Sequence, residues 1–408
     1  MRKQVHPVIS AVVLIVVLGI VLGLYTRGLL GRKAAERPMG GGPPAMRGEQ
    51  PPALGLETVQ VTTLAGHIRP GFADGKGWNA RFNGPSGVAV ASDGSLYVSD
   101  SRNHRIRRVT SQGETTTVAG SGPVDCLPGG FADGAADEAR LFNPAGIAVA
   151  RDGTIYFADS GNHRIRALRH GIVRTVAGGP TQADALGFEA GGWRDGPGPQ
   201  ARFRFPAGLA LTPEGDILVA DVGNRVVRRI AQDGTVSTLV REQRLEAPTS
   251  LAAVTGASHA LIVADAEAAA LFGAAPSGEL NRLPLSGLAP RRPTAVCPLP
   301  SGRLAVADAE WHVIYGLEPS GHSVLLAGVL PSSPSPGYVN GNGAEAHFAG
   351  PCALAAAGHT IYVADFGNNC IRVVKVPSLW TVPTPEPRRW PRPRAGPWRR
   401  RDGENAAH

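Results

Sequence analysis

The sequence predicts an all-β fold in which one four-stranded antiparallel unit is repeated six times and closed into a ring. Three observations lead to this prediction. The 408 residues include 53 glycines and 35 prolines but only 6% aromatic residues, a composition typical of many short strands joined by tight turns. An aspartate that ends an apolar segment recurs six times between residues 57 and 376. An unassigned strand-like segment precedes the first repeat. A repeat is stronger evidence for architecture than any single local motif.

The first repeat shows the unit in full. After Pro85 the chain reads "GVAVAS", "DG", "SLYVSD", "SRNH", "RIRRVT", "SQG" and "ETTTVAG", which is four short strands with turn residues between them. Asp-Gly is a strong signal for a two-residue hairpin turn. The second and third copies begin "GIAVARDGTIYFAD" and "GLALTPEGDILVAD", and the fourth and fifth are degraded but legible.

The sixth repeat ends after its third strand, "CIRVVKV", and lacks a fourth. Residues 59–66, "VQVTTLAG", match that missing strand. If this segment pairs with the last repeat, it closes the array and removes its exposed edges. The predicted fold is therefore a six-bladed β-propeller of four-stranded antiparallel blades, closed by an N-terminal strand, together with one N-terminal transmembrane helix.

Three blocks carry a family resemblance. Residues 97–109 ("YVSDSRNHRIRRV"), 156–168 ("YFADSGNHRIRAL") and 362–374 ("YVADFGNNCIRVV") resemble NHL repeats. The resemblance implies a six-bladed propeller over about residues 57–376. Relatives of this family include a zinc-dependent amidating lyase, so the resemblance alone leaves an enzyme open.

The repeated polar residues form a turn motif after the second strand of each unit. We interpret the motif as structural, because a catalytic group should occur once and these recur up to six times. The aspartates are expected to accept backbone N–H groups of the following turn, and the asparagines to supply a left-handed residue. The motif comprises Asp100, Asn103, His104, Asp159, Asn162, His163, Asp221, Asn224, Asp265, Asp308, Asp365 and Asn368.

A shared metal site is the competing interpretation of this motif. His104, His163 and His312 occupy the same aligned position in repeats 1, 2 and 5. Strands in a blade step outward by about 4.8 Å each, which keeps equivalent residues of neighbouring blades too far apart for one ion. We therefore predict no metal ligands, no cofactor and no catalytic residues.

The N-terminal region predicts a membrane anchor. Residues 8–25, "VISAVVLIVVLGIVLGLY", contain no charge, and 18 helical residues just span a hydrocarbon core. Residues 1–28 are expected to be a signal-anchor and 29–56 a Pro/Gly-rich linker to the propeller at 57–376. The propeller is expected outside the cytoplasm, and it would be secreted if the segment were a cleaved signal peptide.

Charge separates the ends from the middle. Residues 1–56 carry a net charge of +5 and residues 377–408 a net charge of +4, which leaves −1 for the repeats. Binding of nucleic acid by the propeller is therefore unlikely on sequence grounds. Residues 377–408 hold seven prolines, seven arginines and three tryptophans, which predicts a disordered tail able to contact anionic surfaces.

Four long connections share a second motif, at residues 71–85, 130–144, 192–206 and 337–351. The phenylalanines Phe82, Phe142, Phe203 and Phe348 are expected to fill the seams between blades. The connections into repeats 4 and 5 are short, so we expect a cleft over these two repeats. The candidate partner-binding residues on the loops are Trp78, Arg81, Arg102, Trp193 and Arg202.

Two further expectations complete the prediction. Cys352 and Cys370 fall in the same repeat, and a disulfide between them is an open alternative to two free thiols. The favoured function is a non-enzymatic, membrane-tethered scaffold that binds a protein or glycan partner through its loop-rich face. The alternative is a propeller-hosted lyase or hydrolase with a metal at the central channel. First-strand segments such as "GVAV" and "CALA" are small and apolar, which favours the scaffold.

Overall fold

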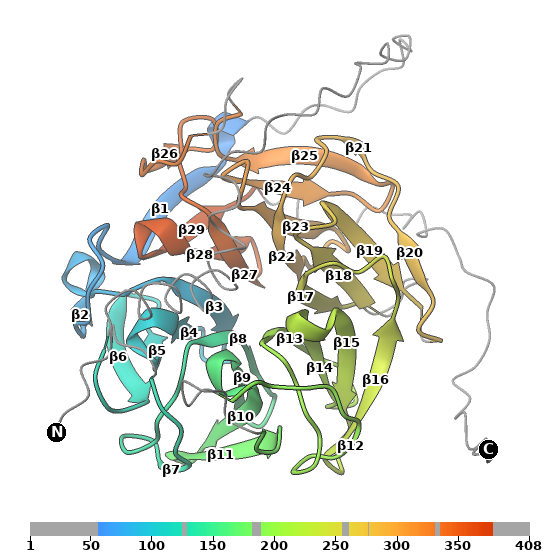
Figure 1. Ribbon diagram of the computed structural model, residues 1–408. Coiled ribbons are helices and arrows are strands. Elements are labelled where there is room, and N and C mark those ends of the chain that lie inside the picture. The colour runs from blue at the N-terminus through green and yellow to red at the C-terminus, as the bar shows by residue number, and fades with distance from the viewer. Residues whose placement is uncertain are drawn as a thin grey trace, which may run out of the picture. The chain divides into compact units, whose positions relative to one another are not determined.

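The computed structural model describes residues 56–124, 129–181, 189–254, 261–275, 277–330 and 335–377. Over these residues 29 strands form six sheets, and Figure 1 shows the sheets arranged as blades around a central axis. The innermost strands of successive blades contact one another around the whole circle, including the last with the first. This part of the chain is a six-bladed β-propeller, as the repeats predict.

Blades 1 to 3 each contain four consecutive strands and an added short one. Blade 1 comprises β3 (Pro85–Val90), β4 (Leu96–Asp100), β5 (Arg105–Val109), β6 (Glu114–Ala119) and β2 (Gly75–Lys76). Blade 2 comprises β8 (Pro144–Val149), β9 (Ile155–Asp159), β10 (Arg164–Arg169), β11 (Ile172–Ala177) and β7 (Gly134–Ala135). Blade 3 comprises β13 (Pro206–Leu211), β14 (Ile217–Asp221), β15 (Val226–Ile230), β16 (Thr235–Arg241) and β12 (Gly196–Pro197).

Blades 4 to 6 follow the same plan with two differences. Blade 4 has four strands, β17 (Pro248–Ala253), β18 (Leu261–Asp265), β19 (Ala270–Ala274) and β20 (Leu280–Arg282). Blade 5 comprises β22 (Pro293–Pro298), β23 (Leu304–Asp308), β24 (Val313–Leu317), β25 (His322–Ala327) and β21 (Ser286–Gly287), and β21 runs parallel to β25. Blade 6 comprises β27 (Pro351–Ala357), β28 (Thr360–Asp365), β29 (Cys370–Lys375), β1 (Gln60–Gly66) and β26 (Gly341–Asn342).

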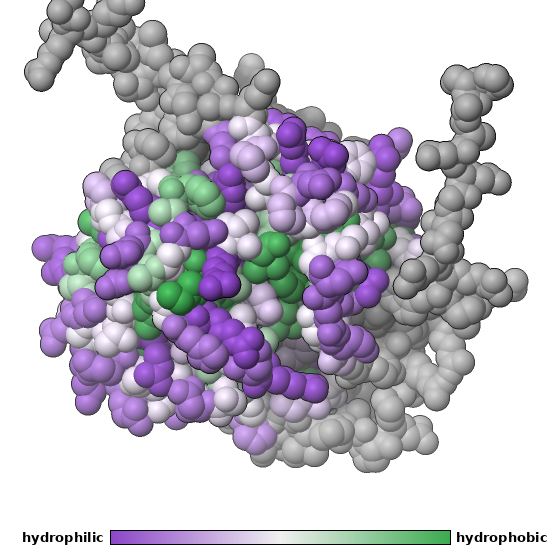
Figure 2. All heavy atoms as spheres, turned by 90° about the horizontal axis from the view of Figure 1, so that it is seen from below, coloured by the Kyte–Doolittle hydropathy of each residue, from purple (hydrophilic) through white to green (hydrophobic). Residues whose placement is uncertain are grey.

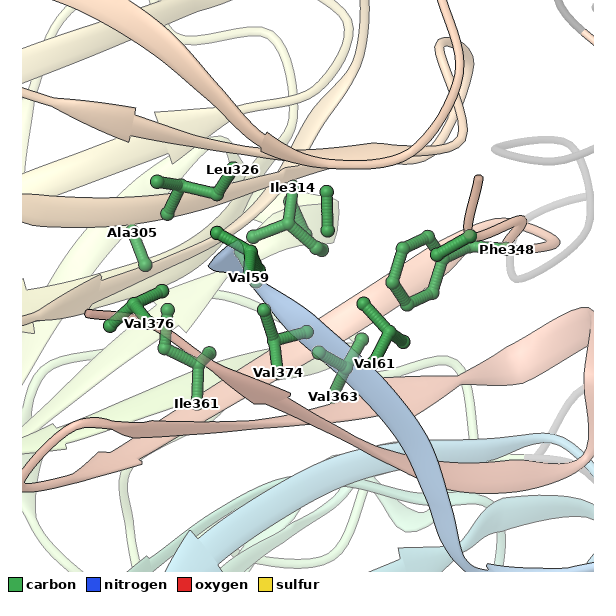
Figure 3. Packing of buried hydrophobic residues seen from close by; sticks show 14 of the residues in the cluster. Val59, Val61, Ala305, Ile314, Leu326, Phe348, Ile361, Val363, Val374 and Val376 are labelled. Atoms are coloured by element: carbon green, nitrogen blue, oxygen red, sulfur yellow. The ribbon is translucent and has the colours of Figure 1, made fainter. Parts of the chain in front are cut away.

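The N-terminal strand closes the ring in the predicted place. β1 pairs antiparallel with β29, from Gln60 opposite Lys375 to Gly66 opposite Cys370. Figure 3 shows Val59 and Val61 packed among residues of blades 5 and 6, and both valines are fully buried. The last blade therefore gains its fourth strand from a segment about 300 residues away in the sequence.

The fifth strands were not predicted. Each is a two-residue segment of the connection that enters its blade, and it pairs with the outermost long strand. Segments this short carry no readable period, which is why the sequence suggests four strands per blade.

The described residues include six short 3-10 turns, four of which lie at the loop-bearing end of the blades, where the long connections enter the inner strands. The one preceding β1 is η1 (Leu56–Thr58), and η2 (Gly77–Asn79) follows β2. Four more join the second and third strands of blades 1, 2, 3 and 6: η3 (Ser101–Asn103), η4 (Ser160–Asn162), η5 (Val222–Asn224) and η6 (Phe366–Asn368).

Apolar side chains fill the seams between blades. Phe82 is fully buried between blades 6 and 1, Phe203 between blades 2 and 3, and Phe348 between blades 5 and 6. Between blades 1 and 2 the residue equivalent to Phe82 is Leu141, because the second loop reads "ARLF" where the first reads "ARF". Phe142, the next residue, is also buried and packs edge-on against His104 of blade 1, with ring centroids 5.7 Å apart, so it lies at the same seam, as predicted.

The inner strands approach one another closely around the axis. A Cβ on Gly87 or Gly146 would stand 2.2 Å from a carbonyl oxygen of the next inner strand. Glycine is required here because only hydrogen fits between the two backbones.

No helix among the described residues is long and apolar enough to span a membrane. The predicted anchor at residues 8–25, the linker up to residue 55 and the tail from residue 378 lie outside the described residues.

Candidate functional site: the loop-bearing face

A buried ion pair organises the turn motif in four blades. In blade 1, Asp100 Oδ1 accepts the Asn83 N–H at 2.8 Å, and Oδ2 accepts Asn103 Nδ2 at 2.8 Å. Arg107 Nη1 donates to the same Oδ2 at 2.7 Å, and both ionic side chains are fully buried. The same pairs recur as Asp159–Arg166, Asp221–Arg228 and Asp365–Arg372.

These four arginines, which we call the hub arginines, also hold the long loops. In blade 1, Arg107 donates to the carbonyls of Arg81 and Ala73 and to Asp74, at 3.1, 2.7 and 2.6 Å. Asp74 in turn accepts the Thr117 N–H on β6 at 3.0 Å. One guanidinium therefore connects the second-strand aspartate, the incoming loop and the outer strand.

Burial raises the pKa of all four aspartates in these pairs above the ordinary value of a carboxyl group. Burial raises the pKa of Asp100 and of Asp221 to about 6, against the opposing effects of Arg107 and Arg228. A buried carboxylate of this kind is tolerated because it is paired with an arginine and also accepts a backbone N–H and an asparagine amide.

Two details of the predicted turn motif differ from the structure. In blades 1, 2, 3 and 6 the aspartate accepts a backbone N–H from the preceding loop, not from the following turn; only Asp265 and Asp308 bond the turn that follows them. The asparagines are also not left-handed. Asn103, for example, donates to Asp100 and to the Gly71 carbonyl at 2.8 Å, and the residue after it adopts φ 58. Asn162, Asn224 and Asn368 make the equivalent pair of bonds.

In blades 1, 2, 5 and 6 the left-handed residue of the turn accepts a hydrogen bond from the loop that enters the neighbouring blade. Asn143 N–H donates to His104 Nδ1 at 3.2 Å, Phe205 N–H to His163 Nδ1 at 3.0 Å, and Gly350 N–H to His312 Nδ1 at 3.0 Å. Asn369 does the same with Oδ1, which accepts Gly84 N–H at 2.9 Å. We call these four bonds the seam bonds.

The histidines must be neutral to accept these bonds. In His163 the other nitrogen, Nε2, lies 2.8 Å from the Glu189 carbonyl and therefore carries the proton. Burial lowers the pKa of His163 to about 4 and also lowers the pKa of His312. The three aligned histidines thus serve three separate seams.

Blades 4 and 5 replace the hub. Phe272 and Tyr315 stand where the other blades have a hub arginine, seven residues after Asp265 and Asp308. Asp265 is bonded by the N–H groups of Glu246, Ala247 and Ala268. Backbone donors here take over the role of the arginine.

An aromatic residue of each long loop packs against an arginine, which is a hub arginine in blades 1, 2 and 6 and Arg241 in blade 3. Phe72, Phe131, Trp193 and Tyr338 occupy one position of the loop motif, immediately after its first glycine. Phe72 and Phe131 lie 4.9 Å from the guanidinium carbons of Arg107 and Arg166, yet they are 40% and 44% exposed. Trp193 is 43% exposed, lies 4.3 Å from Arg241 and donates to Thr238 at 3.1 Å. Their rings are exposed but fixed.

The five candidate binding residues are spread over blades 1 and 3. Trp78 is half exposed in η2 and packs against His67 and Tyr338 at 4.5 and 5.9 Å. Arg102 lies 5.0 Å over the Phe366 ring, which fixes it at the seam between blades 6 and 1. Arg81 and Arg202 are exposed, and their backbones form isolated β-bridges with Ala73 and Arg194 of the same loops. The structure does not bring these five side chains together at one point.

The described parts of the long loops do not wall a cleft. Each lays its two-residue strand along the outer edge of the blade, away from the axis, before crossing inward. The expected cleft over blades 4 and 5 is therefore not formed by these segments.

The disulfide alternative is also wrong. Cys352 and Cys370 are both free. They lie on β27 and β29, with β28 between them, so two strand spacings of about 4.8 Å exceed the limit of about 7 Å between bridged Cα atoms. The Cys352 thiol instead lies 3.3 Å from the Pro85 carbonyl of the next blade.

The axis offers no metal site within the described ranges. No group of three or more His, Cys, Asp or Glu side chains in them is arranged to hold a metal ion.

Sequence reasoning missed the hub arginines and two of the exposed aromatics, Phe72 and Phe131. A signal for the arginines was present. An arginine follows the aspartate by seven residues in those four repeats that a long loop enters, and in no other repeat.

Comparisons with known proteins agree with this geometry. The NHL repeat family matches residues 82–109 and 203–226, and the teneurin NHL domain matches residues 111–187. The chain is 33% identical over 202 residues to NHL repeat-containing protein 2 of Bos taurus, covering 45% of this chain and 27% of that protein. It is 32% identical over 184 residues to the chloroplastic protein SUPPRESSOR OF QUENCHING 1 of Arabidopsis thaliana, covering 40% and 17%. It is 35% identical over 206 residues to Teneurin-m of Drosophila melanogaster, covering 46% of this chain and 7% of that protein. The chain thus matches about a quarter or less of the length of each of these relatives.

Solved structures show the same fold. A protein of unknown function from Bacteroides thetaiotaomicron superposes with a TM-score of 0.59 at 15% identity, over 78% of this chain and 76% of that one. An auxiliary nutrient binding protein from the same organism superposes with a TM-score of 0.56 at 13% identity, over 78% of this chain and 76% of that chain. The chain belongs to the NHL-repeat β-propeller family.

Proposed function

We propose that this protein is a non-enzymatic scaffold whose propeller binds a partner protein through its loop-bearing face. NHL propellers generally mediate protein interactions. Residues 8–25 would tether the scaffold to a membrane, with the propeller outside the cytoplasm. A glycan partner is the second outcome that the test must distinguish.

The observation that carries the proposal is the row of fixed, exposed aromatics. Phe72, Phe131 and Trp193 belong to three consecutive blades and are each at least 40% exposed. Aromatic residues dominate binding hot spots because they bury much apolar area while losing little conformational entropy. The stacked arginines beneath these rings have already removed part of that entropy.

The surrounding charge indicates the partner's chemistry. Arg81, Arg140 and Arg202 recur at one position in the same three blades, and all three are exposed. One aspartate of each of the three loops is engaged by a hub arginine: Asp74, Asp133 and Asp195. A partner surface with apolar side chains and carboxylates fits this face best.

The test replaces the aromatics together, as Phe72→Ala, Phe131→Ala and Trp193→Ala. Chemical cross-linking in cells, followed by mass spectrometry, should identify partners of the full chain whose yield falls at least tenfold in the triple variant. Ile172→Ala, at an exposed residue of β11 at the other end of the blade, is the matched control. Undiminished yield in the triple variant would contradict the proposal, and loss of signal after glycosidase treatment would point to a glycan.

The tether has its own test. The full chain should remain in the membrane pellet after carbonate extraction, and a chain lacking residues 1–28 should not. External protease should degrade the propeller in sealed cells if it lies outside the cytoplasm.

A further inference from the structure

Blade 4 differs from its neighbours at the rim. In the five other blades, a short strand from the incoming connection covers the outermost long strand, as β2 covers β6 and β12 covers β16. Among the described residues, β20 has no such partner. The connection into blade 4, residues 242–247, is short and supplies no strand. Figure 2 looks at the ring edge-on from the side of blades 2 and 3, where hydrophilic residues cover most of the rim.

The backbone of β20 presents hydrogen-bonding groups to this open side. The Leu283 N–H donates to the Leu271 carbonyl at 2.9 Å, and the Ala275 N–H donates to the Glu279 carbonyl at 2.9 Å. Leu271–Leu283 and Ala275–Glu279 are therefore hydrogen-bonded pairs of the antiparallel ladder, and so is Gly273–Asn281 midway between them. The pairs that alternate with these are not hydrogen-bonded. Leu280 and Arg282, which lie between them, therefore direct their N–H and C=O groups away from β19.

The open edge is lined with arginine. Arg244 donates to the Leu280 carbonyl at 2.5 Å, and its side chain is 53% exposed. Arg282 on the edge is exposed, and Arg241 lies three residues before Arg244, against the exposed Trp193. The nearby acids are Glu242, 3.8 Å from Arg244, and Glu279, bonded to Asn281.

We propose that the β20 edge binds an extended, acidic segment of a partner protein as the fifth strand of blade 4. The five other blades show that the fold accepts a strand at this position. Main-chain pairing would use the Leu280 N–H and both main-chain groups of Arg282, since Arg244 already bonds the Leu280 carbonyl. The carboxylates of the segment would meet Arg244 and Arg282. This surface is separate from the aromatic row and adds a second binding site to the proposed scaffold.

The test uses a fluorescein-labelled peptide of alternating valine and glutamate and the purified full chain. Arg282→Pro removes an outward N–H without breaking the β19–β20 ladder and should weaken binding at least tenfold. Arg244→Glu should weaken binding by a similar factor through charge. As a control for folding, both variants should give the circular dichroism spectrum of the wild type. A valine–lysine peptide should not bind.

Hydrogen exchange locates the bound peptide. Protection of the Leu280 and Arg282 amides supports strand addition, whereas protection confined to the loops of blades 1 to 3 overturns it. Equal binding by wild type and Arg282→Pro, or no binding by wild type, also overturns it. The triple aromatic variant should bind the peptide normally, so failure of the loop-face proposal would be seen separately.

Discussion

The seam bond of His163 should make the propeller sensitive to acid, and His163→Asn should remove that sensitivity. Asn369 provides the precedent, because it occupies the equivalent position at φ 53 and its Oδ1 reaches the next blade at 2.9 Å. Asparagine tolerates the left-handed conformation that His163 adopts at φ 56. The variant therefore keeps an acceptor for Phe205 N–H but cannot be protonated.

The magnitude follows from the pKa of His163. Burial lowers it from 6.5 to about 4, with Glu189 opposing the shift and Arg164 and Arg204 adding to it. The unfolded chain binds a proton as the pH falls below 6.5, and the folded chain does so only near 4. The free energy of unfolding is therefore undiminished above pH 6.5 and should fall by about 3 kcal/mol between pH 6.5 and 4, at about 1.36 kcal/mol per pKa unit.

Urea unfolding of the full chain, followed by circular dichroism between pH 7.5 and 4, measures this effect. Between pH 7.5 and pH 4, the wild type should lose about 3 kcal/mol more unfolding free energy than His163→Asn. Contributions from the buried aspartates cancel in this difference. His170→Asn is the control, since His170 is also left-handed, at φ 49, but exposed. A difference that stays constant across the pH range would refute the reasoning.

Three other substitutions test the framework by thermal or urea unfolding. Arg166→Met should cost about 3–5 kcal/mol, because it leaves the Asp159 carboxylate buried without its counter-charge, and adding Asp159→Asn should restore part of the loss. Gly146→Ala should cost about 1–3 kcal/mol, because its Cβ would stand 2.2 Å from a carbonyl oxygen, whereas Gly192→Ala meets only a flexible side chain and should be milder. Val61→Asp places a carboxylate at a fully buried site of the closing strand and should prevent cooperative unfolding of the ring as one unit; an unchanged transition would contradict the role of β1.

The ring was predictable because its evidence is long-range and redundant. Six copies of one pattern, and an N-terminal segment that fits the gap in the sixth, both point to closure. Neither signal depends on knowing which way any one side chain points. The place of β1 beside β29 follows from this pattern alone.

The hub was not predictable in the same way because its strand is buried on both faces. In β5 both Ile106 and Arg107 are inaccessible, so apolar alternation gives no direction. Arg107 then looks like an interruption of an apolar strand. Two of its four acceptors are loop carbonyls, and the sequence does not show where these carbonyls point. The role of Leu141 was missed for a similar reason, since a one-residue offset within a loop leaves no signal in the sequence.

The differences in blades 4 and 5 follow from loop length. A hub arginine can be buried only if the incoming loop brings carbonyls such as Ala73 and Arg81 to its guanidinium. A short connection cannot supply them, and an unpaired buried charge would be strongly destabilising. Phe272 and Tyr315 fill the vacant positions instead. In blade 4 the shortening also removes the strand that would cover β20, so the same change that removes the arginine from the interior leaves an edge open at the rim.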